Sequence, residues 1–252
     1  MSDLTQSNPW DELRAHTSAR IALGRVGSSL PTREVLKFGL AHAQARDAVH
    51  RPLDFAGLRE QLDSAGFRTL HVCSDAPDRP TYLLRPDKGR HLQDDCYARL
   101  SAQASAPELA IVIADGLSSI AVQRHAVPLL ELFRQRFATD WTNTPVVLAE
   151  QGRVAIGDGI AVALRARLVI VLIGERPGLT SPDSLGLYLS YQPQVGMMDS
   201  QRNCISNVRP EGLPYDLAAH KLDYLARQAL HLQLSGVGLK DDSGLLQIKQ
   251  SD

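Results

Sequence analysis

The sequence has few of the features that place a protein in a membrane or outside the cell. Its 252 residues contain no run of about 20 apolar residues, which a membrane-spanning helix requires. The first residues, MSDLTQSNPWDELRAH, are polar and lack the apolar segment of a signal peptide. The three cysteines are too few and too scattered for a disulfide framework or a metal knuckle. We therefore expect a soluble cytoplasmic protein with reduced thiols and no membrane partner.

An excess of charge of one sign is also missing. Twenty-seven basic and 28 acidic residues give a net charge of -1, which argues against a chain whose task is to neutralise a phosphate backbone. Aromatic residues make up only 5% of the sequence, so side chains on which bases could stack are scarce. We expect no nucleic-acid partner.

Motifs of common catalytic sites are absent as well. The sequence has no G-x-S-x-G elbow, no H-E-x-x-H and no P-loop, and its eight histidines never pair at the spacing of metal ligands. Cys204, in the polar segment MDSQRNCISN, is open to two interpretations, a reactive thiol or a small apolar contact. We predict neither a catalytic residue nor a metal ligand in this chain.

What the sequence does contain is a repeating order of strand, turn and helix from about Pro107 onward. The segments ELAIVIA, TPVVLAE and RLVIVLIG are apolar throughout instead of alternating, so they are expected to be buried on both faces of a parallel sheet between helix layers. RVAIGDG followed by IAVALRA predicts a short strand and a short helix, and a last helix is predicted from Pro214 to Leu234. We expect residues 106–252 to form an α/β domain with a doubly wound, mostly parallel, Rossmann-like sheet.

Residues 1–105 have a different pattern. A helix is predicted from Asn8 to Gly24, a second from Thr32 to Val49, and a third from Asp54, its N-cap, to Leu62. FRTLHVCS and TYLLRP resemble two short strands around a Pro/Asp turn. This region is predicted to be a helical N-terminal arm with a small hairpin, that is, a small α+β region.

Ligands of open α/β sheets bind beyond the carboxyl ends of the strands, where glycines gather in this sequence. Each glycine and polar residue at these strand ends could also be an ordinary turn or cap residue. Gly157-x-Gly159 with Glu175 18 residues after Gly157 approaches the dinucleotide fingerprint. Val162 weakens that interpretation, because it stands where the fingerprint has a small third residue.

Six segments together carry a resemblance to a known family. They lie between Thr17 and about Leu234, and they are ARIALGRVG, SLPTREVLKFGLAHAQARDAVH, ADGLSS, IGERPGL, DSLGLYLSYQP and DSQRNCISNVRPEGL. The sequence resembles the small subunit of ethanolamine ammonia-lyase. The resemblance implies an adenosylcobalamin-dependent enzyme that converts ethanolamine to acetaldehyde and ammonia by a radical mechanism. It also implies a large subunit that holds the substrate-binding and catalytic residues, further copies of the small subunit, and an association with a bacterial microcompartment.

The family's cobalamin contacts carry over to three positions of this sequence: Val154 in GRVAIGDG, Glu175 in IGERPGL and Cys204 in QRNCISN. A carboxylate at a strand end can accept hydrogen bonds from the amide arms of the corrin ring. Val154 would offer an apolar contact, and Cys204 a small side chain with its backbone groups. As ordinary structural residues the three would be turn or core residues.

Two further expectations follow from the same resemblance. No histidine in the sequence completes D-x-H-x-x-G, so the benzimidazole of the cofactor is predicted to stay on cobalt, with its nucleotide tail along the strand ends. The arm, which carries Arg20, Arg25 and Arg33, is predicted to lie on the large subunit. A stand-alone NAD-binding oxidoreductase and a non-catalytic scaffold subunit remain alternatives.

Overall fold

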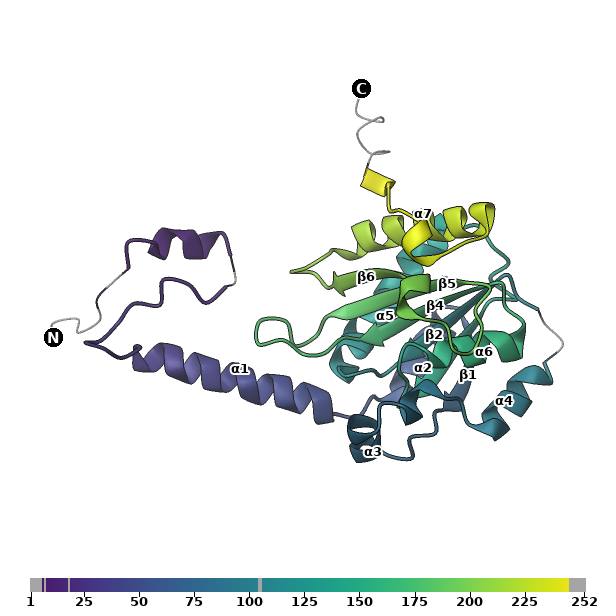
Figure 1. Ribbon diagram of the computed structural model, residues 1–252, viewed down its shortest axis with the longest axis horizontal. Helices are drawn as coiled ribbons and strands as arrows, with labels where there is room; N and C mark the ends of the chain where they lie inside the picture. The colour runs from purple at the N-terminus through teal and green to yellow at the C-terminus, as the bar shows by residue number, and fades with distance from the viewer. Residues whose placement is uncertain (1–5, 7, 18, 104–105, 245–252) are drawn as a thin grey trace, which may run out of the picture.

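The computed structural model describes residues 6, 8–17, 19–103 and 106–244. These residues fold around a six-stranded sheet in which the strands follow the order β1-β3-β2-β4-β5-β6 (Figure 1). The strands are β1 (Arg68–Cys73), β2 (Leu109–Ala114), β3 (Pro145–Glu150), β4 (Leu168–Gly174), β5 (Leu185–Tyr191) and β6 (Asn203–Val208). The three apolar segments of the sequence form β2, β3 and β4, as predicted.

The α/β class is as predicted, but the sheet is mixed, so a doubly wound, Rossmann-like parallel sheet is not confirmed. Strands β1 to β4 pair in parallel, whereas β5 is antiparallel to β4 and β6 is antiparallel to β5. Residues 175–184 join β4 to β5, and residues 192–202 join β5 to β6. A parallel connection needs about a dozen residues or more, usually with a helix, so these short connections return the chain antiparallel.

Helices cover both faces of the sheet. The α-helices are α1 (Thr32–His50), α2 (Phe55–Ser64), α3 (Arg79–Leu84), α4 (Asp94–Ser101), α5 (Ser119–Arg136), α6 (Ile156–Leu164) and α7 (Tyr215–Leu232). Short 3-10 helices are η1 (Asp11–Ala15), η2 (Lys88–Arg90), η3 (Asp199–Gln201) and η4 (Gly236–Gly238). One hydrophobic core lies between the sheet and helices α2, α5 and α7, and a second lies between the sheet and helices α4 and α6. The described residues include no helix long and apolar enough to span a membrane.

The predicted hairpin of the first region is wrong. The segment FRTLHVCS contains β1, which pairs in parallel with β3 inside the main sheet. TYLLRP lies mostly in α3, because Asp78 accepts a hydrogen bond from the Thr81 backbone N–H and Pro80 suits the first turn of a helix. The sheet therefore takes one of its strands from residues 1–105, and the division of the chain after residue 105 stays a prediction.

Two more predicted elements differ from the structure. The helix expected from Asn8 to Gly24 is only the 3-10 helix η1 followed by irregular chain, and Ser18 lies outside the described residues. The strand expected in RVAIGDG does not form, because the GDG segment lies inside α6. Gly157 faces β4 so closely that any side chain there would collide with Val171, which lets α6 pack directly on the sheet.

The remaining predicted helices are confirmed. Helix α1 spans Thr32–His50, and the Asp54 side chain caps α2 through the Gly57 backbone N–H at 2.9 Å. Helix α7 spans Tyr215–Leu232. Helix α1 extends away from the sheet and its helices (Figure 1), and its exposed apolar side chains are Val35, Leu36, Phe38 and Leu40.

Candidate cofactor-binding face

The candidate site lies on one side of β5 and β6. Side chains alternate along a strand, so Leu187, Leu189 and Ile205 enter the core beneath α7, whereas the residues between them point to the opposite side. Helices α4 and α6 cover that opposite side over the parallel strands. Over β5 and β6 it presents an area that we call the open face, formed by Gly186, Tyr188, Cys204 and Ser206.

Glu175 lies at the edge of the open face, directly after β4. Its carboxylate crosses β5 and accepts hydrogen bonds from the Ser206 hydroxyl at 2.6 Å and from the Asn207 backbone N–H at 3.2 Å. Gly186 makes this reach possible, since a Cβ at that position would come within 3.1 Å of a Glu175 carboxylate oxygen. Each carboxylate oxygen can accept more than one hydrogen bond, so Glu175 retains acceptor capacity for a ligand.

Cys204 lies in β6, directly opposite Tyr188 of β5. Part of the residue is exposed, which agrees with the polar segment seen in the sequence. Burial raises the pKa of the Cys204 thiol; the neighbouring Tyr188 hydroxyl lowers that pKa, and the Glu175 carboxylate raises it. The thiol is therefore protonated at neutral pH, and the structure favours a contact residue over a reactive thiolate.

Val154 lies in the turn between β3 and α6. It is half-buried and packs against the same core as Tyr188. Val154 and Glu175 thus follow the carboxyl ends of parallel strands, as the sequence predicts for ligand-binding residues. Cys204 does not, because its partner Tyr188 pairs with Val171 in the middle of β4.

A buried ion pair connects the two elements that carry Val154 and Cys204. The guanidinium of Arg202, the residue directly before β6, donates to both carboxylate oxygens of Asp158 in α6, at 2.6 and 2.7 Å. Both side chains are only 2% exposed, and Arg202 also donates to the Ser190 hydroxyl. The sequence analysis does not predict this pair, because its members are 44 residues apart and no local pattern links them.

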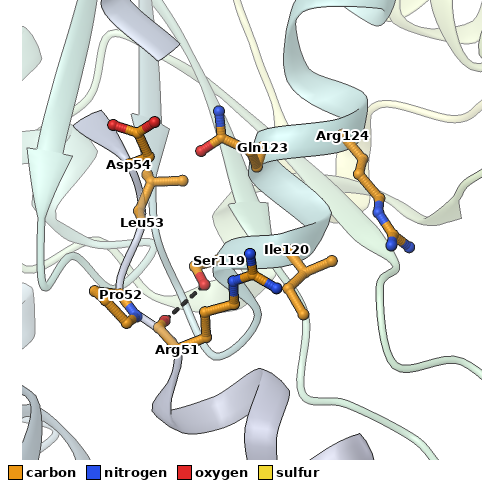
Figure 2. Close-up of a pocket in the computed structure, with 8 residues that line it drawn as sticks. All are labelled: Arg51, Pro52, Leu53, Asp54, Ser119, Ile120, Gln123 and Arg124. Atoms are coloured by element: carbon orange, nitrogen blue, oxygen red, sulfur yellow. Dashed lines mark hydrogen bonds between the residues drawn. The ribbon is translucent and has the colours of Figure 1, made fainter. Parts of the chain in front are cut away.

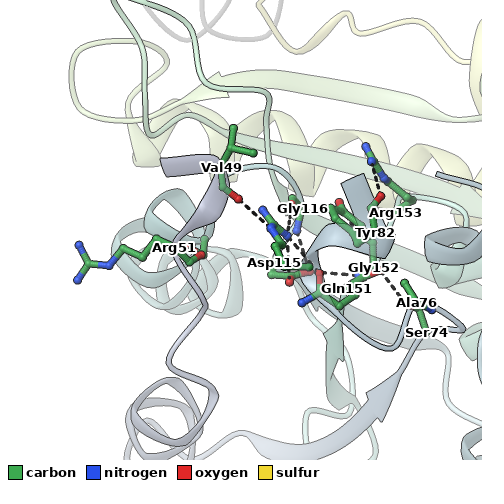
Figure 3. A network of polar contacts seen from close by, with 12 residues as sticks. Val49, Arg51, Ser74, Ala76, Tyr82, Asp115, Gly116, Gln151, Gly152 and Arg153 are labelled. Atoms are coloured by element: carbon green, nitrogen blue, oxygen red, sulfur yellow. Dashed lines mark hydrogen bonds and ion pairs between the residues drawn. The ribbon is translucent and has the colours of Figure 1, made fainter. Parts of the chain in front are cut away.

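The strand ends of β2 and β3 do not form an open crevice. Helix α5 follows β2 and packs on one face of the sheet, whereas α6 follows β3 and packs on the other. Open α/β sheets bind ligands at the ends of two such strands, between the diverging helices. Here α3 supplies Arg79, which donates to the Gly116 carbonyl at 2.8 Å. It also supplies Tyr82, which donates to the Gly152 carbonyl at 3.1 Å (Figure 3). Asp115 accepts from the Gly152 backbone N–H and is buried, which raises its pKa to about 6. Side chains of α3 therefore fill the space beyond these two strand ends, which leaves no room there for a ligand.

The dinucleotide fingerprint is not formed. Gly157 and Gly159 lie inside α6 instead of in the turn before it, and Asp158 between them is held by Arg202. A phosphate-binding turn needs such glycines between strand and helix. Tyr188 and Tyr191 lie in β5 as strand residues.

A cavity of 490 Å³ lies between the end of α1 and the N-terminal turns of α5 (Figure 2). The Ser119 hydroxyl donates to the Arg51 carbonyl at 2.6 Å beside it. Its lining residues are Arg51, Pro52, Leu53, Asp54, Ser119, Ile120, Gln123 and Arg124. None of the three residues predicted to bind cofactor lines this cavity.

The fold and the open face define an α/β protein with a sheet face available for a ligand or a partner chain. A family model described as "Ethanolamine ammonia-lyase light chain (EutC)" matches residues 7–240. The chain therefore belongs to the ethanolamine ammonia-lyase light-chain family, and the resemblance seen in the sequence is confirmed.

Relatives named "Ethanolamine ammonia-lyase small subunit" match nearly the whole chain. That of Azotobacter vinelandii strain DJ is 55% identical over 250 residues, which cover 96% of this chain and 93% of the relative. That of Pseudomonas putida strain F1 is 54% identical over 253 residues, with coverages of 98% and 93%. That of Pseudomonas fluorescens strain Pf0-1 is 58% identical over 241 residues, with coverages of 94% and 88%.

Proposed function

We propose that this chain is the small subunit of an adenosylcobalamin-dependent ethanolamine ammonia-lyase and that its open face binds part of the cofactor. The substrate-binding and catalytic residues would belong to the large subunit. The observation that carries the proposal is the Glu175 carboxylate, which lies beside the open face with acceptor capacity left over from Ser206 and Asn207. When bound, the cofactor supplies radical chemistry through cleavage of its cobalt–carbon bond.

The residues present fit the periphery of a corrinoid. Its amide arms need hydrogen-bond acceptors, and an ionised carboxylate accepts bonds roughly twice as strong as those to a neutral group. Gly186 leaves space beside Glu175, and the Cys204 side chain adds little bulk. Val154 would offer an apolar contact at the strand ends. The chain's own part is thus to bind and orient the cofactor and to exclude water from it.

Glu175→Gln tests this role in the complex of the two subunits. It retains the shape of the side chain but removes the charge, so we expect the KM for adenosylcobalamin to rise by roughly tenfold or more. The KM for ethanolamine should change much less. Glu108→Gln is the matched control, because Glu108 is an exposed carboxylate paired with Arg167 at the amino end of the sheet. A larger effect of Glu175→Gln on ethanolamine than on cobalamin would reject the assigned role.

Co-expression with the large subunit tests the need for this chain. We expect deamination only when both subunits and adenosylcobalamin are present, and full activity of the large subunit alone would contradict the proposal. If this chain were only a scaffold, it would support assembly while Glu175→Gln left the cobalamin KM unchanged.

We further propose that α1 and the segment before it contact the large subunit. Of the three arginines predicted for this contact, Arg20 donates to the Leu179 carbonyl and Arg25 to the Gln6 side chain, and Arg33 pairs with Glu34. The Arg25 and Arg33 contacts lie within the arm, whereas the Arg20 contact joins the arm to the connection between β4 and β5. The exposed apolar side chains of α1 are therefore the better candidates for the partner contact.

The resemblance supports two finer proposals. Because no histidine of this chain completes D-x-H-x-x-G, a bound cofactor would keep its benzimidazole on cobalt. Electron-spin spectra with labelled cofactor should then show coupling to benzimidazole nitrogen, whereas coupling to a histidine nitrogen would reject this. The assembly contains several copies of each subunit, in the cytoplasm or within a bacterial microcompartment, which native mass spectrometry and cell fractionation can test.

A further inference from the structure

A histidine, a cysteine and a glutamate come together at the opposite edge of the sheet from the open face. His71 and Cys73 are two residues apart on β1 and therefore point to the same side of the sheet. Cys73 is the register partner of Glu150, the last residue of β3. One ligand atom of each residue lies within 4.8 Å of the other two. Neither the family's cofactor contacts nor the network at Asp115 uses this cluster.

We propose that His71, Cys73 and Glu150 bind a divalent transition-metal cation, with Zn²⁺ as the best match. Imidazole nitrogen, thiolate sulfur and carboxylate oxygen are the three donor types that zinc takes in proteins. Three protein ligands leave a fourth tetrahedral position for water or for a group of a partner chain.

The distances suit a tetrahedral site after a small adjustment. His71 Nε2 lies 2.9 Å from one Glu150 oxygen, and Cys73 Sγ lies 3.9 Å from the other. Zinc bonds of about 2.0–2.3 Å place tetrahedral ligand atoms about 3.3–3.8 Å apart. Binding would therefore require the His71–Glu150 contact to lengthen and the Cys73–Glu150 contact to shorten, each by a few tenths of an ångström.

The surroundings support entry and retention of a cation. The His71 and Glu150 side chains are 42% and 40% exposed, so solvent reaches the cluster. The Phe55 ring meets the His71 ring edge to face at 5.6 Å and limits its orientation. Burial raises the pKa of the Cys73 thiol to about 11, so the cation must displace the thiol proton to solvent when it binds. The resulting thiolate and the Glu150 carboxylate together neutralise the charge of the cation. The Arg99 guanidinium donates to the His71 carbonyl and to the Cys96 sulfur, so it is engaged outside the three proposed ligand atoms.

Without a cation the same residues would form only a hydrogen bond between His71 and Glu150, with the Cys73 thiol beside it. Measurement of bound zinc distinguishes this metal-free arrangement from a metal site. We would purify the cofactor-free complex of both subunits, load it with Zn²⁺, and compare zinc content by mass spectrometry for wild type, Cys73→Ser and Glu150→Gln. His91→Ala is the matched control, since His91 is an exposed imidazole outside the cluster.

The expected result is that both cluster variants lose about one zinc per small subunit relative to wild type, whereas His91→Ala loses none. Substitution with Co²⁺ should give a thiolate-to-cobalt charge-transfer band that is absent in Cys73→Ser. Equal zinc contents in wild type and Cys73→Ser, or bound cobalt without the thiolate band, would overturn the proposal.

Thermal unfolding shows whether a loss of zinc in a variant results from the loss of a ligand or from misfolding. Zinc should raise the unfolding temperature of the wild-type complex, because it binds the folded state, and should leave that of Cys73→Ser unchanged. In the absence of metal both proteins should unfold at the same temperature. A zinc-dependent rise of equal size in both would also count against the site.

Discussion

The buried pair of Asp158 and Arg202 permits a quantitative prediction. Asp158→Ala would leave the Arg202 guanidinium, which is 2% exposed, without its carboxylate. Removing one partner of a buried pair costs about 3–5 kcal/mol, because the remaining charge stays desolvated. Ser190 and the Met197 carbonyl also accept hydrogen bonds from Arg202, so the guanidinium cannot leave without breaking them. We expect the free energy of unfolding to fall by this amount in urea denaturation.

The large loss of stability expected for Asp158→Ala depends on the burial of the ion pair, and an exposed ion pair of the same chain serves as a control. Arg85 and Asp87 form a pair with the same 2.7 Å distance, but their side chains are 60% and 55% exposed. Asp87→Asn should leave the denaturation midpoint unchanged within error, because exposed pairs contribute little. If Asp158→Ala lowered stability no more than Asp87→Asn, the reasoning from burial would be refuted.

A double variant distinguishes the contribution of the Asp158–Arg202 pair to the stability of the chain from its role in positioning the residues of the open face. Asp158→Leu combined with Arg202→Met replaces the pair with apolar side chains, and such replacements are often neutral or stabilising. We expect it to recover most of the stability lost in Asp158→Ala. It removes the tie between α6 and β6, however, so the KM for adenosylcobalamin should stay raised, since Val154 and Cys204 are carried by these two parts of the chain. A normal cobalamin KM in the double variant would show that the pair does not position the site.

Three further predictions concern other parts of the chain. Burial raises the pKa of Asp115 from 3.8 to about 6. The contribution of this carboxyl group to stability is therefore greatest below pH 4 and is lost as the pH rises through 6. In denaturation experiments the free energy of unfolding of the wild type, relative to that of Asp115→Asn, should fall by roughly 3 kcal/mol between these two pH values. Gly157→Ala should destabilise the chain by about 1–3 kcal/mol in the same assay, because the added methyl group collides with Val171; an unchanged midpoint would contradict the close packing of α6 on β4. Leu36→Ser with Leu40→Ser should weaken association with the large subunit in gel filtration while changing the stability of the chain little, because these side chains are 67% and 59% exposed; unaltered association would remove α1 from the interface.

The parts of the fold that were predictable from sequence are those with strong local signals. Strands β2, β3 and β4 are continuous apolar runs, and α1 and α7 have helical spacing of apolar residues. Helix α3 also has a local signal, Asp78 as N-cap with Pro80 in the first turn, but its apolar residues favoured the interpretation as a strand. The place of β1 beside β3 has no local signal, because it depends on pairing between segments about 77 residues apart.

The candidate site was less accessible to such reasoning. Spacing and composition single out Glu175 as a carboxylate after a buried strand, but its contacts with Ser206 and Asn207 depend on β6 lying two strands away. The position of Cys204 on the sheet face depends on the same pairing. Only the family resemblance selected both residues, and no pattern in the sequence predicts the pair formed by Asp158 and Arg202.

The open face is created by a feature that the sequence analysis did not predict, the antiparallel addition of β5 and β6 to the sheet. In a doubly wound parallel sheet, the crossover from each strand to the next brings a helix that covers one side of the sheet. Residues 175–184 and 192–202 contain no α-helix, so β5 and β6 extend the sheet antiparallel and receive α7 on one side only. The other side is left for Gly186, Tyr188, Cys204 and Ser206, with Glu175 at its edge. Such a face suits the proposed function, in which this chain would bind one part of a large cofactor while the rest stays accessible to the large subunit.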